Sequence, residues 1–152
     1  MVGFLYMYDL NAPLTPIHAA SPLTYVIVVR CGAAQQSQAL SAFHFTKELL
    51  LQGHRVVRVF FYQQGVQWAS GLKVTPQGEV NLTSLWQQLG EAHGLELGVC
   101  IAAALQGGIV DQQEASRYEL TSHNLAPHFS LIGLGQLASA SADCDRLVSF
   151  GG

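Results

Sequence analysis

The sequence predicts a single α/β domain of three layers, α/β/α, in which helices cover both faces of a mostly parallel sheet of about five strands. Three observations lead to this prediction. The chain has 152 residues, which fits one domain of ordinary size. Apolar runs of strand length alternate with segments of helical periodicity. The first run, residues 23–30, is almost continuously β-branched, which is typical of a strand buried on both faces.

The first half of the domain contains two expected strands and two expected helices. Residues 37–52 follow the first strand as a helix, because apolar residues such as Leu40 and Phe43 recur at helical spacing and Gly53 marks the end. Residues 55–62, with the sequence RVVRVFFY, form the second expected strand. The second helix follows a glycine-containing loop and carries apolar side chains on one face: Leu82, Leu85, Trp86 and Leu89.

The second half continues the alternation with shorter elements. Residues 96–103, with the sequence ELGVCIAA, predict a third strand, and residues 111–120 predict a short polar helix. A short fourth strand is expected at residues 129–132, a helix of small residues at 134–142, and a closing strand at 146–150. Such sheets gather ligands and reactive groups at the carboxyl ends of their strands, so the site is expected there.

Residues 1–22 form an expected extension that precedes the domain at residues 23–152. The extension has no clear period and contains three prolines: Pro13, Pro16 and Pro22. Its apolar start, residues 1–10, has no Lys or Arg ahead of it and contains Asp9, unlike a secretory signal. No apolar run in the chain approaches the 18 or so residues of a membrane span. We therefore expect a cytoplasmic protein that does not bind membranes.

The composition predicts an oligomer that does not bind nucleic acid directly. Hydrophobic residues make up 49% of the chain and charged residues 11%, against about 25% charged in a typical soluble domain. A surface so short of charge indicates that another subunit covers part of it. The seven basic residues are scattered and the formal net charge is -3, so a basic footprint for nucleic acid is missing.

The three cysteines form no CxxC pair and no zinc-ligand set with histidine, which indicates free thiols. Cys100 lies near the carboxyl end of the third expected strand, where a thiol at the start of a helix can be a nucleophile; the alternative is that it packs in the sheet. Cys31 ends the first strand and is either a resolving thiol or a small structural residue. Cys144 precedes the last strand, at the opposite edge, and is expected to pack.

Other candidate groups carry weaker signals. The six histidines include no HExxH motif and no compact cluster, so no metal is expected. Asp111, Glu114 and Arg117 share one face of a short helix and could orient a charged partner or form a local ion network. No Walker, GxSxG or GxGxxG motif is present, so no cofactor is expected either, and a nucleotide-binding flavodoxin-like module is left only as a third alternative.

From residue 23 to the end, the chain resembles the DsrE/TusD-like family of small sulfurtransferase subunits. The landmarks of the resemblance run through the whole domain: Val59-Phe60-Phe61-Tyr62, Gly65-Val66, Trp86, His93-Gly94, Cys100-Ile101-Ala102-Ala103-Ala104, Gly108-Ile109-Val110-Asp111, Glu114-Ala115, Arg117, Asn124-Leu125, Gly133-Leu134-Gly135 and Asp145-Arg146.

The resemblance implies that Cys100, which precedes the alanine run, carries the transferred sulfur as a persulfide and needs no other cofactor. It further implies a hetero-oligomer with TusB- and TusC-like subunits, a TusA-like donor, a TusE-like acceptor and 2-thiouridine formation on tRNA as the purpose of the relay. Thiol exchange of this kind requires a partly exposed cysteine. Two alternatives remain: a DsrEFH-type subunit of dissimilatory sulfur oxidation, and a non-catalytic scaffold subunit of such a complex.

Overall fold

The computed structural model describes residues 21–152, and the extension predicted at residues 1–22 therefore lies almost entirely outside the described residues. The described chain folds around a five-stranded sheet with the order β4-β3-β2-β1-β5, in which every pair of neighbours is parallel. The strands are β1 (Thr24–Val29), β2 (Arg55–Phe61), β3 (Leu97–Cys100), β4 (Phe129–Ile132) and β5 (Arg146–Phe150). The predicted parallel α/β sheet is confirmed.

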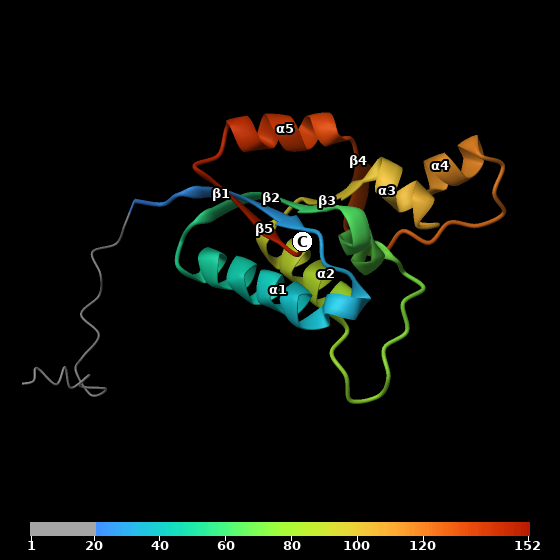
Figure 1. Ribbon diagram of the computed structural model, residues 1–152, viewed down its shortest axis with the longest axis horizontal. Helices are drawn as coiled ribbons and strands as arrows, with labels where there is room; N and C mark the ends of the chain where they lie inside the picture. The colour runs from blue at the N-terminus through green and yellow to red at the C-terminus, as the bar shows by residue number, and fades with distance from the viewer. Residues whose placement is uncertain (1–20) are drawn as a thin grey trace, which may run out of the picture.

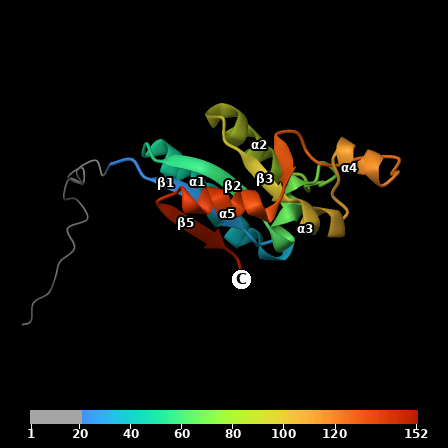
Figure 2. The same ribbon diagram turned by 90° about the horizontal axis from the view of Figure 1, so that it is seen from above.

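Helices cover both faces of the sheet, as the sequence predicts. Helices α1 (Gln36–Leu51) and α2 (Leu82–His93) lie on one face and α5 (Leu134–Ala142) lies on the other (Figure 1). Seen from above, α5 lies across the strands, while α3 (Ile101–Gln106) and α4 (Gln112–Arg117) extend beyond the end of β3 (Figure 2). Within residues 21–152, no helix combines the length and the apolar character that crossing a bilayer requires.

One predicted boundary was wrong, and it lies where the site is expected. The third strand does not run to residue 103: it ends at Cys100, and α3 begins at Ile101. The alanines that follow Cys100 are the strongest helix formers, which explains why the chain leaves the sheet there. The loop expected after β2 contains a 3-10 helix, η2 (Gln63–Ala69), and a second one, η1 (Ala33–Gln35), precedes α1.

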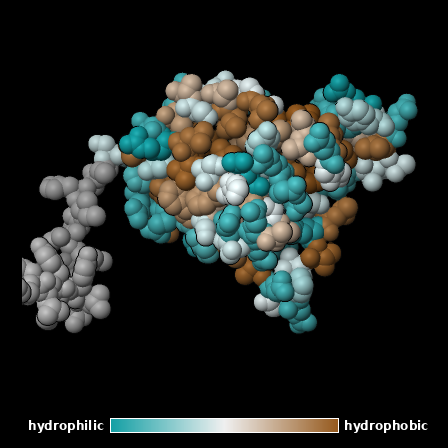
Figure 3. All heavy atoms as spheres, in the orientation of Figure 1, coloured by the Kyte–Doolittle hydropathy of each residue, from teal (hydrophilic) through white to brown (hydrophobic). Residues whose placement is uncertain are grey.

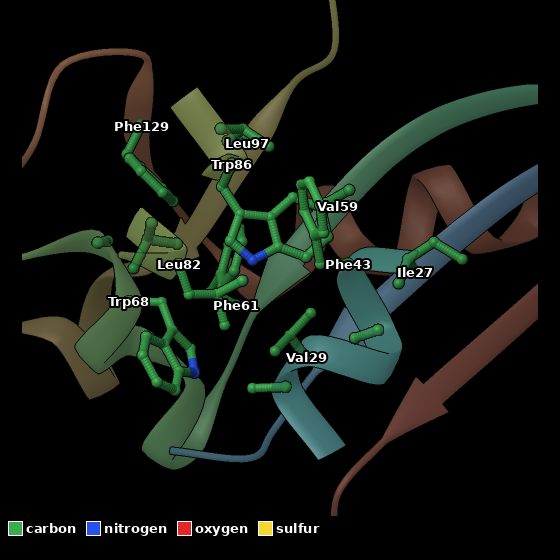
Figure 4. Packing of buried hydrophobic residues seen from close by; sticks show 14 of the residues in the cluster. Ile27, Val29, Phe43, Val59, Phe61, Trp68, Leu82, Trp86, Leu97 and Phe129 are labelled. Atoms are coloured by element: carbon green, nitrogen blue, oxygen red, sulfur yellow. The ribbon is translucent and has the colours of Figure 1, made fainter. Parts of the chain in front are cut away.

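The larger hydrophobic cluster lies between the sheet and helices α1 and α2. Trp86 is fully buried at its centre, as the apolar face of the second helix predicts. Its ring meets Phe43 at a centroid distance of 5.2 Å and Phe61 at 5.4 Å, both edge to face (Figure 4). Such aromatic pairs add about 1 kcal/mol each beyond area burial. This face therefore supplies most of the core.

The smaller cluster lies on the α5 face of the sheet. Its buried members are Val26, Val28, Phe60, Cys100 and Ile132. On this face a Cβ at Gly98 would collide with Ile132 Cδ1, so the glycine makes room for the isoleucine to lie over β3. No residue of α5 is fully buried, and Leu137 and Ala140 only partly cover the cluster. Cys100 is thus in the smaller and more thinly covered of the two clusters.

Asp145 joins the amino ends of β1 and β5. Its Oδ2 accepts hydrogen bonds from the Thr24 amide at 2.8 Å and from the Thr24 hydroxyl at 2.7 Å. Its own amide donates to Thr24 O at 3.0 Å. Because the two Thr24 donors favour the ionised form, they lower the pKa of the Asp145 carboxyl below its ordinary value. The first and last strands are held in register at this point.

The carboxyl ends of β1, β2 and β5 are packed together without space between them. A Cβ at Gly65, in η2, would collide with the carbonyl oxygen of Val29 at the end of β1. A Cβ at Gly151, after β5, would come within 2.7 Å of the Cys31 amide nitrogen. Trp68 Nε1 donates to Cys31 O at 2.8 Å and ties η2 to the same place. These contacts fix the position of η2 against the sheet.

We predict that Gly65→Ala destabilises the fold by about 3 kcal/mol, because the added methyl group meets backbone that cannot move aside. Gly135→Ala is the control, since a Cβ at that helical position has nothing within 4 Å; it should be neutral or slightly stabilising. Urea denaturation followed by circular dichroism measures both changes. Equal stability of the two variants would contradict the close approach of η2 to β1.

Candidate active site at the carboxyl edge of the sheet

Cys100 occupies the junction between a strand and a helix. It is the last residue of β3, paired with Ile132 of β4, and it is also the N-cap residue of α3. No side chain caps the first turn of α3. The first backbone amides of a helix have no intrahelical acceptor, so they remain available to an anion at this junction. A cysteine thiolate or a persulfide is an anion of that kind.

The thiol of Cys100 is covered in the isolated chain. Cys100 is 2% exposed and packs with Phe60 and Ile132 on the α5 face. Tyr62 and Ala103 are partly buried and pack against the same cluster. Cys100 therefore packs in the sheet in the described chain, and the partial exposure that thiol exchange requires is not present. A reaction at this thiol needs a local opening of the structure.

Cys31 reaches the same edge of the sheet but does not lie beside Cys100. Strand β2 stands between the two, so their strands are roughly 10 Å apart. Cys31 is fully buried in the larger cluster, whereas Cys100 belongs to the smaller one. Burial raises the pKa of the Cys31 thiol above its ordinary value. A disulfide needs Cα atoms about 4.4–6.8 Å apart, so this arrangement does not permit a direct bond between the two cysteines.

Cys144 lies just before β5, at the opposite edge, as predicted. It is partly buried, and its Sγ lies 3.4 Å from Ser141 O and 3.3 Å from Arg146 O. The prediction that it packs is confirmed.

The charged residues predicted on one face of the short helix contact one another. Asp111 Oδ1 accepts from the Glu114 amide at 2.8 Å, and Arg117 Nη1 lies 3.7 Å from Glu114 Oε1. Of the two interpretations given to that group, the ion network is observed.

A pocket of about 370 Å³ lies beside the helix that Cys100 begins. Helix η2 contributes Gln63, Gln64 and Gln67 to its lining, and α3 contributes Ala103 and Gln106. Ala103 lies three residues after Cys100, so it faces the same side of the chain one turn later. Ala103 lines the pocket and packs against both hydrophobic clusters, including the one that contains Cys100.

The glutamines of η2 are held in fixed positions. Gln63 has a φ of +51°, a left-handed conformation that costs free energy in a residue with a side chain. Arg30 Nε donates to Gln63 Oε1 at 2.9 Å and holds that side chain. Sequence reasoning missed these glutamines. The signal that could have found them is the run Gln63-Gln64-Gly65-Val66-Gln67 directly after a buried strand.

The charged groups nearest to this edge are few. The pair Arg58–Glu96, at 2.6 Å, lies away from it at the amino end of β3, and Arg58 also donates to Gln136 O at 3.0 Å. Lys73 Nζ lies 4.0 Å from the centre of the Trp68 ring, and desolvation lowers its pKa. Within residues 21–152, no three His, Cys, Asp or Glu side chains lie together in a way that would hold a metal ion.

The structure is a parallel α/β sheet with a cysteine between strand and helix at its carboxyl edge, and similarity to known proteins places the chain within one family. Residues 24–150 match the DsrE/DsrF-like family, and the chain belongs to that family. The prediction from sequence is confirmed. The chain is 48% identical over 128 residues to a protein of Erwinia tasmaniensis named sulfurtransferase TusD, an alignment that covers 84% of this chain and all of that protein.

A solved structure shares the fold. The crystal structure of the YchN protein of E. coli matches with a TM-score of 0.63 and 16% identity, over 84% of this chain and 99% of that one. At this identity the likeness concerns the architecture of the sheet and its helices. The described chain therefore shares its fold with nearly the whole of the YchN protein.

We predict that Cys144 reacts with iodoacetamide at least about tenfold faster than Cys100 or Cys31 in the native protein, because only Cys144 is partly exposed. In urea the three rates should converge, since unfolding removes the cover from each thiol. Peptide mass spectrometry of samples quenched over time gives the three rates separately. Native labelling of Cys100 as fast as Cys144 would contradict its burial.

Proposed function

We propose that the protein is a sulfurtransferase subunit that accepts persulfide sulfur on Cys100 and passes it to an acceptor thiol. The observation that carries the proposal is the place of Cys100: the end of a central strand, against the uncapped first turn of α3. The relative named sulfurtransferase TusD, 48% identical, supports the same activity. Within a family of this kind, the strand end supplies a rigid position and the helix supplies amide donors.

The reaction is an exchange between thiols. The Cys100 thiolate attacks the outer sulfur of the donor persulfide, a new S–S bond forms, and the bond between the two donor sulfurs breaks. The donor leaves as a thiolate and takes up a proton. An acceptor thiolate then attacks the outer sulfur of the Cys100 persulfide and regenerates the Cys100 thiolate. The amides at the start of α3 favour both anionic forms of Cys100, and no other cofactor is needed.

The proposed pathway is the relay that makes 2-thiouridine in tRNA. In it, TusB- and TusC-like subunits assemble with this chain, a TusA-like protein donates the sulfur and a TusE-like protein accepts it, all in the cytoplasm. The tRNA itself would be bound elsewhere, because the chain carries a net charge of -3 and scattered basic residues. The name of the Erwinia relative supports this placement.

The surface supports an assembly with other subunits. Large apolar side chains are exposed on the loop between η2 and α2, where Leu72 is 72% exposed, Val74 is 89% and Val80 is 48%. Figure 3 shows apolar surface on this loop and again along α5 and the strands beneath it. Side chains of this kind gain stability when a partner covers them.

A second candidate function is that of a non-catalytic scaffold subunit. The burial of Cys100, which is 2% exposed, favours it, because a covered thiol cannot exchange sulfur until the structure opens. In that case Cys100 is a packing residue and the exposed apolar side chains serve assembly alone. The two functions differ in whether sulfur is ever found on Cys100.

We predict that Cys100→Ser abolishes sulfur acceptance while Cys31→Ser and Cys144→Ser retain it, because only Cys100 lies at the junction with α3. The measurement is intact and peptide mass spectrometry after incubation with a persulfidated carrier protein, with and without co-expressed partner subunits. One added sulfur on the Cys100 peptide, removed by reductant, is expected. Transfer that survives in Cys100→Ser would overturn the proposal, and absence of sulfur in the wild-type complex would support the scaffold.

A further inference from the structure

The route by which a sulfur atom could reach Cys100 is limited to few places, because its own cluster covers the thiol. Phe60 and Ile132 are buried in the same cluster, and Leu137 and Ala140 of α5 pack against that cluster. Helix α3 also lines the 370 Å³ pocket, and its small residue Ala103 both lines this pocket and packs against the cluster of Cys100. A methyl group is the least obstruction that a residue with a side chain can offer.

The pocket also has a fixed hydrogen-bonding polarity. Arg30 Nε can only donate, so it is the Gln63 amide oxygen that faces Arg30. The NH₂ group of Gln63 takes no part in this hydrogen bond. The backbone amide of Ala33, which also can only donate, bonds to Gln67 Oε1 at 3.1 Å and so sets the orientation of the Gln67 amide group. Gln67 Nε2 then donates to Gln64 Oε1 at 2.9 Å, which leaves the Gln64 NH₂ group. Within the described residues, neither NH₂ group has an acceptor, so both can donate to an occupant of the pocket.

A pocket with two amide donors and no carboxylate in its lining suits an anion. The left-handed backbone of Gln63 also supports a binding site here. Residues with side chains keep this conformation where the surrounding structure holds them, and they cluster at functional sites. Arg30, bonded to Gln63 behind the pocket, adds a positive charge nearby. The three observations are independent of the thiol itself.

We propose that this pocket is the entry site for the donor's persulfide anion, that Gln63 and Gln64 hold the anion by their NH₂ groups, and that Ala103 sets access to Cys100. The inference rests on the proposed function. In the step it describes, the Cys100 thiol passes its proton to the bound persulfide anion, the Cys100 thiolate then bonds to the outer sulfur, and the donor S–S bond breaks, which leaves the donor thiolate beside the two amide donors. The sum is R–SS⁻ plus Cys100–SH giving R–S⁻ plus Cys100–SSH, with no outside oxidant or reductant.

Substitution at Ala103 tests the route. Ala103→Leu fills the gap between pocket and thiol and should slow sulfur uptake from glutathione persulfide at least about tenfold, because a reacting atom held even 1 Å away is poorly placed. The matched control is Ala102→Leu, which adds the same side chain to the same helix on its exposed side. Uptake on the Cys100 peptide, followed by mass spectrometry, should remain at the wild-type rate in the control.

Substitution at Gln63 tests the anion. Gln63→Glu keeps the oxygen that accepts from Arg30 and replaces the NH₂ donor by a second, negatively charged oxygen. We expect about tenfold slower uptake of persulfide and about tenfold slower labelling of Cys100 by anionic iodoacetate, with unchanged labelling by neutral iodoacetamide. The control is Gln88→Glu, which adds the same charge to an exposed position of α2 that does not line this pocket.

The outcomes separate this inference from the proposed function. A wild-type chain that takes no sulfur on Cys100 overturns both. Wild-type uptake that is unchanged in Ala103→Leu overturns the route and points to entry beneath α5. Equal slowing of iodoacetate and iodoacetamide in Gln63→Glu shows a structural change rather than loss of an anion contact and overturns the role of Gln63. Circular dichroism and urea denaturation confirm that each variant is folded before it is assayed.

Discussion

The close approach of η2 to the end of β1 is the contact on which the site depends. The chain leaves every strand of a parallel sheet at the same edge, so the segments that follow β1, β2, β3 and β5 must pack into the same space. Gly65 lets η2 lie directly on the Val29 carbonyl, and Trp68 bonds to Cys31 O at 2.8 Å. With η2 placed in this way, its glutamines stand opposite α3 and enclose the pocket beside Cys100.

The two faces of the sheet have different roles. The α1 and α2 face holds the aromatic cluster around Trp86 and supplies most of the buried apolar surface. The α5 face holds five buried residues, Cys100 among them, beneath a helix with none of its own residues fully buried. Local openings occur where few apolar contacts must be broken. The cluster that contains Cys100 can therefore open locally while the larger cluster keeps the fold intact.

The sequence was sufficient for the features that follow from periodicity. The strand positions, the buried face around Trp86 and the placement of Cys100 at the carboxyl edge all come from apolar patterns that burial enforces. The sequence was insufficient to predict the pocket, because exposed polar residues form its lining. Gln63 and Gln64 face solvent and leave no periodic signal, and the left-handed backbone of Gln63 is fixed by Arg30, 33 residues away. Strand order also needs long-range pairing, so the separation of Cys31 from Cys100 by β2 could not be predicted.

The pairing of β1 with β5 has a consequence for how the protein is made. Thr24 and Asp145 are 121 residues apart in the chain, yet they hold the amino ends of the two strands together. During synthesis, β1 is made long before β5, so the β1 edge that pairs with β5 has no partner until β5 follows. The sheet exposes one edge of an inner strand during this interval, and an exposed strand edge is a place where other chains can pair.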